Sequence, residues 1–535
     1  MPARTAKPFP SLHVFSGCDV PWLLESQEEC RPNKTFLAWE PFEGERRSWT
    51  FGEFSAATRA CASGLLDRGV RAGHFVNLHL DNCPEFLLAW FACARIGAIA
   101  VTTNTGCSRE EFAYFLSNST SRVVLTQPKY LPMVLGASQS LSWVACCSTD
   151  SGAPCAGALP PEVIPFEDLC AKASTLPPLN RDPRRPNHVQ YTSGTTSRPK
   201  GVVWTHGNAL WAAKVTSSHA QLVESDSVPV FFPLFHANAL AYTVLPTLWS
   251  GGTVVLMPKF SSSRFWEITA RHRCTWANMV LFTIRALEDL PDPAQHHFRF
   301  WALLAQIPSV QQRWRIPFIS WYGMTETITQ NIHSFIGFDT PVGAIGHPAH
   351  EYEVAVRFES GADVSSGDVG RLWIRGVPGL SLFLEYLNDA EATDAAFDAN
   401  GWFNTGDEVK LDTAGHIHFV SRAKDMLRVG EENVAALEVE SVINRVPGVV
   451  ECAVIGKPDD MLEEVPVAFV VALDPSPDLE ARILAFCAEA LARFKQPREI
   501  RFIPELPKGL LDKTLKRELR LLLARDRKDG GAGSA

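Results

Sequence analysis

Two spacings of apolar residues alternate along most of the chain. Short apolar runs, typical of buried strands, are followed by segments in which apolar residues recur at helical spacing, and this alternation predicts a parallel sheet covered on both faces. The first units are a helix at 20–29, a helix at 54–66 that starts near Thr50, a strand at 75–80, a helix at 83–96 and a strand at 98–102. Residues 1 to about 50 resemble a preamble, and 147–189, rich in Pro, Ser, Ala and Gly, a loop excursion.

Further along, the alternation continues and then changes. Strands are predicted at 228–232, 253–257, 276–282, 300–304 and 316–320, and a small β unit with shorter strands at 351–358, 370–375 and 408–420. After Arg422, a compact α+β unit is predicted, with helices at 434–444, 479–494 and 514–525 and strands at 449–455, 465–473 and 499–502. The expected fold class is therefore α/β: a large N-terminal domain (1–423) of doubly wound sheets plus a small β unit, and a small mobile α+β C-terminal domain (424–535).

Composition narrows the class of protein. A hydrophobic content of 46% with 20% charged residues is typical of a globular chain, and the net charge of -9 without a basic stripe argues against a nucleic-acid binder. No apolar run reaches the ~18 residues that a membrane span needs, and Met1–Pro10 lacks the apolar segment of a secretion signal. We therefore expect a cytoplasmic protein whose 13 cysteines are reduced. Cys146, Cys147 and Cys155 cluster in a predicted loop, with no second group of ligands at zinc-site spacing.

The stretch from Tyr191 to Gly201 concentrates glycine, hydroxyl residues and a lysine. Small residues let backbone N–H groups converge on an anion, hydroxyls add donors, and Lys200 brings a mobile positive charge. This chemistry suits a polyphosphate, although a surface turn rich in Ser, Thr and Gly is the alternative. The residues expected to bind the nucleotide here are Thr192, Ser193, Gly194, Thr195, Thr196 and Lys200.

Two further turns carry acids. The segment Tyr322-Gly323-Met324-Thr325-Glu326 follows a predicted strand; its carboxylate could hold Mg²⁺ beside a polyphosphate, and its tyrosine could stack on a base. A strand-end turn with a helix cap from Thr325 is the alternative. Asp407, in a Thr-Gly-Asp turn, could accept both ribose hydroxyls, and Arg422 follows after a hairpin that could return it to the same place.

Taken in order, these motifs resemble the adenylate-forming superfamily, which includes acyl-CoA synthetases, adenylation domains of peptide synthetases and luciferases. Segments 79–86, 96–99 and 194–203 are most similar to bacterial carnitine/crotonobetaine–CoA ligases. The resemblance implies that ATP and a small-molecule acid give an acyl-adenylate and pyrophosphate, after which an acceptor attacks and AMP leaves. It also implies that the small domain swings about a hinge near Lys424 between the two steps.

The resemblance assigns further roles. Lys513, a solvated lysine by composition alone, becomes the catalytic lysine that neutralises the carboxylate and the α-phosphate as charge develops. Glu326 and Thr195 complete the expected catalytic residues and are the expected Mg²⁺ ligands. His236, Asn238 and Gly346 are expected to line the acid pocket, whereas a lone histidine on an apolar stretch is ordinarily a core residue.

Two positions depart from the family pattern and leave the acceptor open. Gly430-Glu431 stands where the family has two glycines, the second of which lets pantetheine pass, and Asp512 precedes Lys513 where glycine is usual. The first prediction is an acid–CoA ligase for a small or aromatic acid, with ATP, Mg²⁺ and CoA. The alternative passes the activated group to an amine, as amide-forming or nitrite-activating, diazo-forming relatives (diazotases) of secondary metabolism do. A third possibility is a non-catalytic nucleotide-binding homologue.

Overall fold

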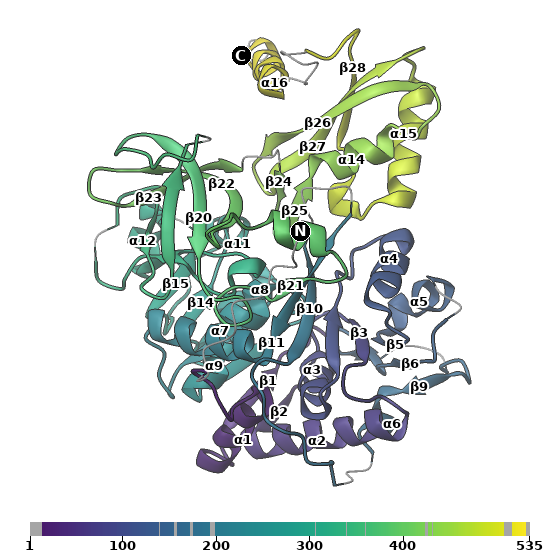
Figure 1. The fold of residues 1–535 in the computed structure, drawn as a ribbon, viewed down its shortest axis with the longest axis vertical. Coiled ribbons are helices and arrows are strands. Elements are labelled where there is room, and N and C mark those ends of the chain that lie inside the picture. Colours follow the sequence, from purple (N-terminus) through teal and green to yellow (C-terminus); the bar gives the residue numbers. More distant parts are fainter. Residues whose placement is uncertain are drawn as a thin grey trace.

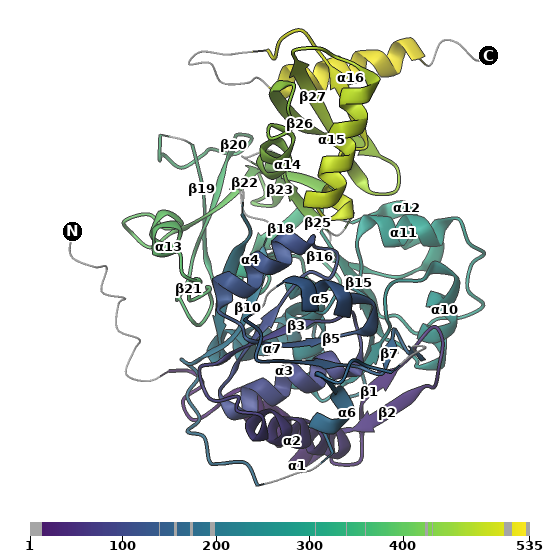
Figure 2. The same cartoon turned by 90° about the vertical axis from the view of Figure 1, so that its right-hand side faces the viewer.

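Two parts of unequal size make up the molecule (Figure 1). The computed structural model describes residues 13–137, 140–154, 158–171, 175–192, 198–304, 306–338, 340–358, 360–422, 426–430, 432–507 and 516–530. The larger part contains three major sheets, and the smaller part, yellow-green in the figure, contains the C-terminal sheet and its helices. Figure 2 shows α15 (Pro477–Ala490) of the smaller part beside α4 (Arg109–Ser119) of the larger one.

An eight-stranded sheet lies at the centre of the larger part. Strands β3 to β6 run parallel, and their almost completely buried apolar runs agree with a sheet covered on both faces. In spatial order the strands are β21 (Glu385–Tyr386), β11 (Lys200–Thr205), β10 (Pro186–Thr192), β4 (Ile99–Thr102), β3 (Phe75–His79), β5 (Val123–Thr126), β6 (Trp143–Cys146) and β9 (Val163–Pro165).

The other two major sheets differ in direction. A four-stranded sheet has the order β12 (Ser227–Val230), β13 (Thr253–Leu256), β1 (Thr35–Trp39) and β2 (Arg47–Thr50). A nine-stranded sheet begins parallel and becomes antiparallel in the order β14 (Trp276–Asn278), β15 (Phe300–Leu303), β16 (Phe318–Tyr322), β17 (Ile332–His333), β18 (Ala344–Pro348), β23 (Ile417–Arg422), β22 (Phe403–Leu411), β20 (Val369–Arg375) and β19 (Glu353–Arg357). A small hairpin joins β7 (Thr149–Asp150) to β8 (Ala153–Pro154).

Helices fill the space between these sheets. Helix α2 (Phe51–Asp67) starts at a capping box in which Thr50 and Glu53 exchange hydrogen bonds, and α3 (Pro84–Ile96) is buried on almost every face. One apolar core joins both helices to strands of all three sheets. The remaining α-helices of this part are α1 (Val20–Cys30), α5 (Leu131–Ala137), α6 (Phe166–Leu169), α7 (His206–His219), α8 (Ala237–Ala239), α9 (Leu245–Ser250), α10 (Ser262–Arg271), α11 (Leu281–Glu288), α12 (Pro308–Trp314) and α13 (Ala390–Ala395).

The smaller part has its own sheet and cores. Its apolar clusters contain only residues from Leu427 onward among those described. The strands are β25 (Glu432–Ala435), β24 (Met426–Val429), β27 (Glu463–Ala472), β26 (Val449–Asp459) and β28 (Glu499–Phe502), and the helices are α14 (Ala436–Ile443), α15 and α16 (Lys516–Gly530). The boundary predicted at Lys424 falls within 423–425, outside the described residues, and stays a prediction.

The expected α/β class, with a large sheet domain and a smaller C-terminal domain, is confirmed. Three expectations about elements are wrong. The preamble contains β1 and β2, because β1 pairs in parallel with the distant β13. The excursion at 147–189 contains β9 and α6, which extend the eight-stranded sheet and cover its edge. The run predicted as a strand at 276–282 ends at Asn278 and enters α11, since a short apolar run does not distinguish a strand from a buried helix.

Within the described residues, no helix is both long and apolar enough to cross a bilayer.

Candidate functional site

The predicted phosphate loop connects two paired strands at one end of the eight-stranded sheet. Strands β10 and β11 are antiparallel, and Thr192 pairs in register with Lys200 at the mouth of the loop. Ser193, Gly194, Thr195 and Thr196 lie outside the described residues. Because β10 also runs parallel to β4 and β3, it ends at the carboxyl edge of the sheet, where open α/β sheets bind ligands.

Lys200 and Glu326 are linked through a tyrosine that the sequence analysis did not select. The Lys200 Nζ atom lies 4.5 Å from the centre of the Tyr386 ring. The Tyr386 hydroxyl donates a hydrogen bond of 3.1 Å to Oε1 of Glu326, whose side chain is buried. Burial and the adjacent carboxylate hold the pKa of Tyr386 well above its usual range. The tyrosine is therefore a neutral donor that connects the loop lysine to the predicted magnesium carboxylate.

The turn that carries Glu326 is fixed through its backbone. Trp204 Nε1 donates to the carbonyl oxygen of Thr325 at 2.9 Å, and the Tyr242 hydroxyl donates to the carbonyl oxygen of Met324 at 3.2 Å. A Cβ atom at Gly323 would lie 2.5 Å from the carbonyl oxygen of Thr329 and 2.8 Å from that tyrosine hydroxyl. Only glycine fits this close approach.

Tyr322 and Asp407 are brought together across the nine-stranded sheet. The tyrosine hydroxyl, at the end of β16, donates to Oδ2 of Asp407 on β22 at 2.5 Å, and both side chains are buried. Arg422 pairs in register with Asp407 from the neighbouring strand β23, so the hairpin returns it to the acid as expected. The three residues predicted around the nucleoside thus share one edge of the sheet.

The predicted acid-pocket residues lie on separate elements. His236 is the N-cap of α8, and Asn238, within that helix, accepts a hydrogen bond from Asn278 after β14. Gly346 lies on β18 with φ +117°, and a Cβ there would lie 2.2 Å from the carbonyl group of His333. The described hydrogen bonds link His236 to the small domain and do not link it to Gly346.

His236 meets an acid from the small domain. Its Nε2 atom lies 3.2 Å from Oε1 of Glu432 at the start of β25, and the same oxygen accepts from Asn104 Nδ2 at 3.0 Å. Burial alone would raise the pKa of Glu432, but the imidazole and these hydrogen bonds outweigh it and lower the pKa. A carboxylate from one domain is therefore held by two side chains of the other.

A second contact between the domains is a buried ionic triad. Lys495 donates to Glu111 of α4 at 2.5 Å and to Glu438 of α14 at 2.7 Å, and all three side chains are buried. Burial lowers the pKa of Lys495, but the two carboxylates more than reverse this effect. The ionised form of Glu438 remains disfavoured, because burial raises its pKa to about 7.

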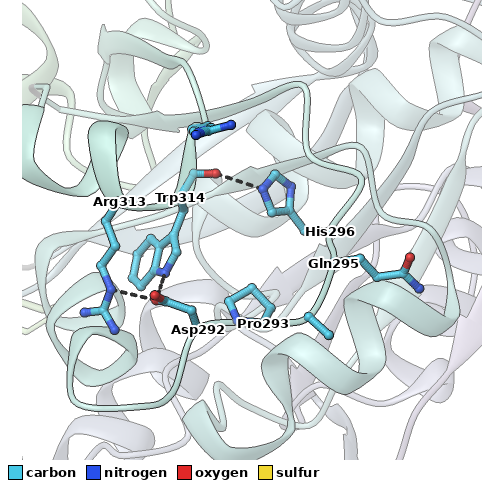
Figure 3. Close-up of a pocket in the computed structure, with 8 residues that line it drawn as sticks. Asp292, Pro293, Gln295, His296, Arg313 and Trp314 are labelled. Atoms are coloured by element: carbon cyan, nitrogen blue, oxygen red, sulfur yellow. Dashed lines mark hydrogen bonds and ion pairs between the residues drawn. The ribbon is translucent and has the colours of Figure 1, made fainter.

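A surface hollow of about 410 Å³ lies apart from these residues (Figure 3). Asp292 accepts hydrogen bonds from Arg313 Nε at 2.7 Å and from Trp314 Nε1 at 2.8 Å, and His296 Nε2 lies 2.9 Å from the Trp314 carbonyl oxygen. These bonds brace the loop before β15 against α12. The hollow contains none of the predicted site residues.

Two protein-family models match this chain over most of its length. The family model described as AMP-binding enzyme matches residues 24–387, and the model for the C-terminal domain of AMP-binding enzymes matches residues 438–513. The chain belongs to the AMP-binding enzyme family. The resemblance drawn from the sequence motifs is therefore confirmed, and the chain is an adenylate-forming ligase.

Individual members of the AMP-binding enzyme family match most of the chain. A crotonobetaine/carnitine–CoA ligase of Citrobacter koseri is 33% identical, covering 95% of this chain and 100% of that protein. The o-succinylbenzoate CoA synthetase of Bacillus subtilis matches in two solved structures. Its double mutant bound to the product analogue OSB-NCoA has a TM-score of 0.81 at 26% identity, covering 93% of this chain and 97% of that one. Its complex with AMP has a TM-score of 0.66 at 27% identity, covering 93% and 98%.

Several residues at the site of this AMP-binding enzyme lie outside the sequence motifs, and only tertiary structure places them: Tyr386, Asn104, Glu432 and Lys495. Asn104 carries a local signal, because it stands within the polar run Thr103-Asn104-Thr105 directly after strand β4. Lys513 and Asp512 lie outside the described residues, and so does Glu431; their predicted roles stay predictions.

Proposed function

We propose that this AMP-binding enzyme is an ATP-dependent acid–CoA ligase acting on a small or aromatic carboxylic acid. The acid's carboxylate attacks the α-phosphate of ATP, which forms the acyl-adenylate and releases pyrophosphate. The CoA thiol then attacks the acyl carbon, loses its proton, and expels AMP. The family membership and the crotonobetaine/carnitine–CoA ligase relative support this chemistry.

The observation that carries the choice of CoA is the similarity to CoA ligases over almost the whole chain. Two structures of one Bacillus subtilis enzyme have nearly the same identity to this chain, but their TM-scores are 0.81 with the CoA product analogue and 0.66 with AMP. We infer from this difference that the domains here are docked as for acyl transfer, with Glu432 and Lys495 contacting the large domain.

The nucleotide roles follow from position. The loop 192–196 and Lys200 are proposed to bind the phosphates, and Tyr322, Asp407 and Arg422 the nucleoside. Glu326 and Thr195 are proposed to hold Mg²⁺: the buried Glu326 carboxylate is the kind of hard oxygen ligand this cation prefers. When bound, the cation would neutralise phosphate charge, while Tyr386 keeps the Glu326 side chain in place by its hydrogen bond.

The acid is proposed to bind beside His236, Asn238 and Gly346. The ring of Phe235 lies 4.7 Å from the His236 ring, and the segment 231–235 is almost wholly buried, so the wall is aromatic and apolar. Such a wall suits the apolar part of a small or aromatic acid.

The test is ATP-dependent pyrophosphate release across aliphatic, aromatic and carnitine-like acids, each with and without CoA. We expect release with a carboxylate, faster turnover with CoA, and a thioester identified by mass. The Lys513→Ala variant should lose adenylation while retaining ATP binding. Pyrophosphate release that ignores CoA with every acid would contradict the proposal.

An amine acceptor is the second candidate, and Glu431 is the feature that favours it. A carboxylate where the family has a glycine would obstruct a pantetheine arm attached to phosphates. Arms of the same assay with aryl amines, and with nitrite plus an aryl amine, distinguish the candidates. An amide or diazo product without any thioester would assign the chain to this alternative, and with it to secondary metabolism.

A further inference from the structure

Two cysteines and a glutamate from distant parts of the chain meet at the carboxyl edge of the eight-stranded sheet. Cys83 is the N-cap of α3, Glu85 lies in the first turn of that helix, and Cys147 directly follows β6. The two sulfur atoms and a carboxylate oxygen all lie within 4.8 Å of one another. The neighbouring Cys146 packs instead into a separate apolar cluster beneath α4, so the pair is Cys83 with Cys147.

The two cysteines of this cluster are buried, Glu85 is half-buried, and the cluster has no strong cationic partner among the described residues. The exposed fractions of Cys83 and Cys147 are 2% and 1%, and no ion pair of Glu85 exists within the described part of the chain. The nearest charges that act on Glu85 are Glu167, which opposes its ionisation, and Arg47, whose effect is weaker. A carboxylate that is partly withdrawn from water beside two buried thiols gains from a cationic partner such as a metal ion.

We propose that Cys83, Glu85 and Cys147 bind one divalent cation with the properties of zinc, through two thiolates and a carboxylate. A tetrahedral zinc ion holds two sulfur ligands about 3.8 Å apart, which the observed spacing accommodates. Binding releases the thiol protons and any proton on the carboxyl group, and the cation then neutralises most of the anionic charge.

The site lies next to a residue that shapes the proposed acid pocket. Asn82 donates to the carbonyl oxygens of Phe232 at 2.8 Å and Met257 at 3.1 Å, and it accepts from the backbone N–H of Leu234 at 2.8 Å. The bound cation would therefore hold the loop after β3 against the end of β6. Asn82 lies in that loop, and its hydrogen bonds would then restrict the movement of the segment before His236. The role is structural, because none of the three ligands has a described contact with the predicted nucleotide residues that the structure includes.

The test measures metal on the intact protein. Chains expressed with zinc and purified without chelators should retain about one zinc per chain, and Cys83→Ser, Cys147→Ser and Glu85→Gln should each retain much less. Cys274→Ser is the matched control, since Cys274 is also buried and free but lies in the connection between α10 and β14. Wild-type protein loaded with Co²⁺ should show a thiolate-to-cobalt charge-transfer band that Cys147→Ser lacks.

The wild-type measurements decide the matter even if a variant fails to fold. Stoichiometric zinc with a cobalt band that a chelator removes supports the site. Wild-type protein that retains no zinc and gives no cobalt band overturns the proposal. So does a Cys83–Cys147 disulfide in non-reduced peptide maps, because oxidised sulfurs are not available as thiolate ligands.

Discussion

His236 of the large domain and Glu432 of the small domain form a hydrogen bond, with Nε2 and Oε1 separated by 3.2 Å. The same carboxylate oxygen also accepts from Asn104. The bond therefore exists only while the domains are docked in this arrangement. It couples the proposed wall of the acid pocket to the position of a domain that is expected to move.

Glu432→Gln should slow acyl transfer and leave adenylation almost unchanged. A hydrogen bond to a charged group contributes about 1.5–3 kcal/mol, so a loss of roughly 10- to 100-fold is expected in thioester formation from preformed adenylate. ATP–pyrophosphate exchange measures the first step separately. Glu489→Gln, on the exposed face of α15, is the control and should change neither rate. Equal losses in both steps would show that Glu432 acts on folding rather than on docking.

Glu111→Gln should weaken the same docking from the large-domain side. Removing one carboxylate from the Lys495 triad leaves the lysine with Glu438 alone, whereas the amide preserves volume and the cap of α4. We expect slower transfer, normal pyrophosphate exchange and faster proteolysis between the domains. Glu391→Gln is the control, because Glu391 is an exposed glutamate in the first turn of α13 of the large domain and no described ion pair joins it to the small domain. An unchanged transfer rate in Glu111→Gln would contradict a docking role for the triad.

Tyr386→Phe should reduce adenylation without abolishing it. The variant retains the ring under Lys200 but loses the hydrogen bond to Glu326, a loss of about 1.5–3 kcal/mol for a bond to a carboxylate. Pyrophosphate exchange should fall roughly 10- to 100-fold. The exchange rate of the Glu326→Gln variant should fall further, since this substitution removes the proposed Mg²⁺ ligand itself. A wild-type rate of pyrophosphate exchange in Tyr386→Phe would show that the tyrosine hydroxyl does not contribute to adenylation.

Gly346→Ala should destabilise the fold through a steric clash. The new Cβ would lie 2.2 Å from the His333 carbonyl group, at φ +117°. Gly361→Ala is the matched control, because Gly361 also has positive φ, +86°, but open space around it. Both variants incur backbone strain of about 1–3 kcal/mol, so the lower melting temperature expected for Gly346→Ala measures the clash itself. Equal melting temperatures would mean that β18 shifts to accommodate the methyl group.

Acid should destabilise the protein through its buried histidines. Burial lowers the pKa of His333 to about 4 and those of His79, His188 and His206 to about 3, from 6.5. Between those values the unfolded chain binds more protons than the folded one, so the free energy of unfolding falls as pH drops from 6.5 toward 4. Denaturant unfolding at pH 7 and pH 5.5 measures the loss. His333→Gln should flatten this dependence by up to about 1.4 kcal/mol per pH unit; an unchanged slope would contradict the buried neutral state.

The sequence identified chemistry carried by contiguous residues better than contacts between distant ones. The loop before Lys200 and the turns at Glu326 and Asp407 are local patterns of glycine, hydroxyl and acid, which a single stretch displays. Tyr386 lies in an ordinary short strand, and only the pairing of β21 with β11 brings it to Lys200. Long-range pairing is not visible in local composition, and the same reason explains the missed strand β1.

The zinc-type cluster illustrates the same limit. Cys147 lies in a stretch of sequence that contains no second group of metal ligands. Its partner Cys83 precedes a helix in a distant segment, so the sequence alone does not indicate the pair. Elsewhere, the apolar spacing was sufficient: the helix predicted at 83–96 and the strand at 98–102 agree closely with α3 and β4. An apolar pattern that continues over the length of a helix predicts one type of element. A short apolar run such as 276–282 fits both a strand and a buried helix.

The contacts between the domains are polar, and this affects how the protein behaves in a crowded solution. Described bonds across the boundary join Lys495 to Glu111 and Glu432 to His236, while the small domain's apolar clusters remain closed on themselves. Water can replace such bonds when the domain rotates, and no large apolar surface is uncovered. The rotation of the small domain in each catalytic cycle would then expose no large apolar surface to other proteins. Catalytic motion would therefore not promote aggregation.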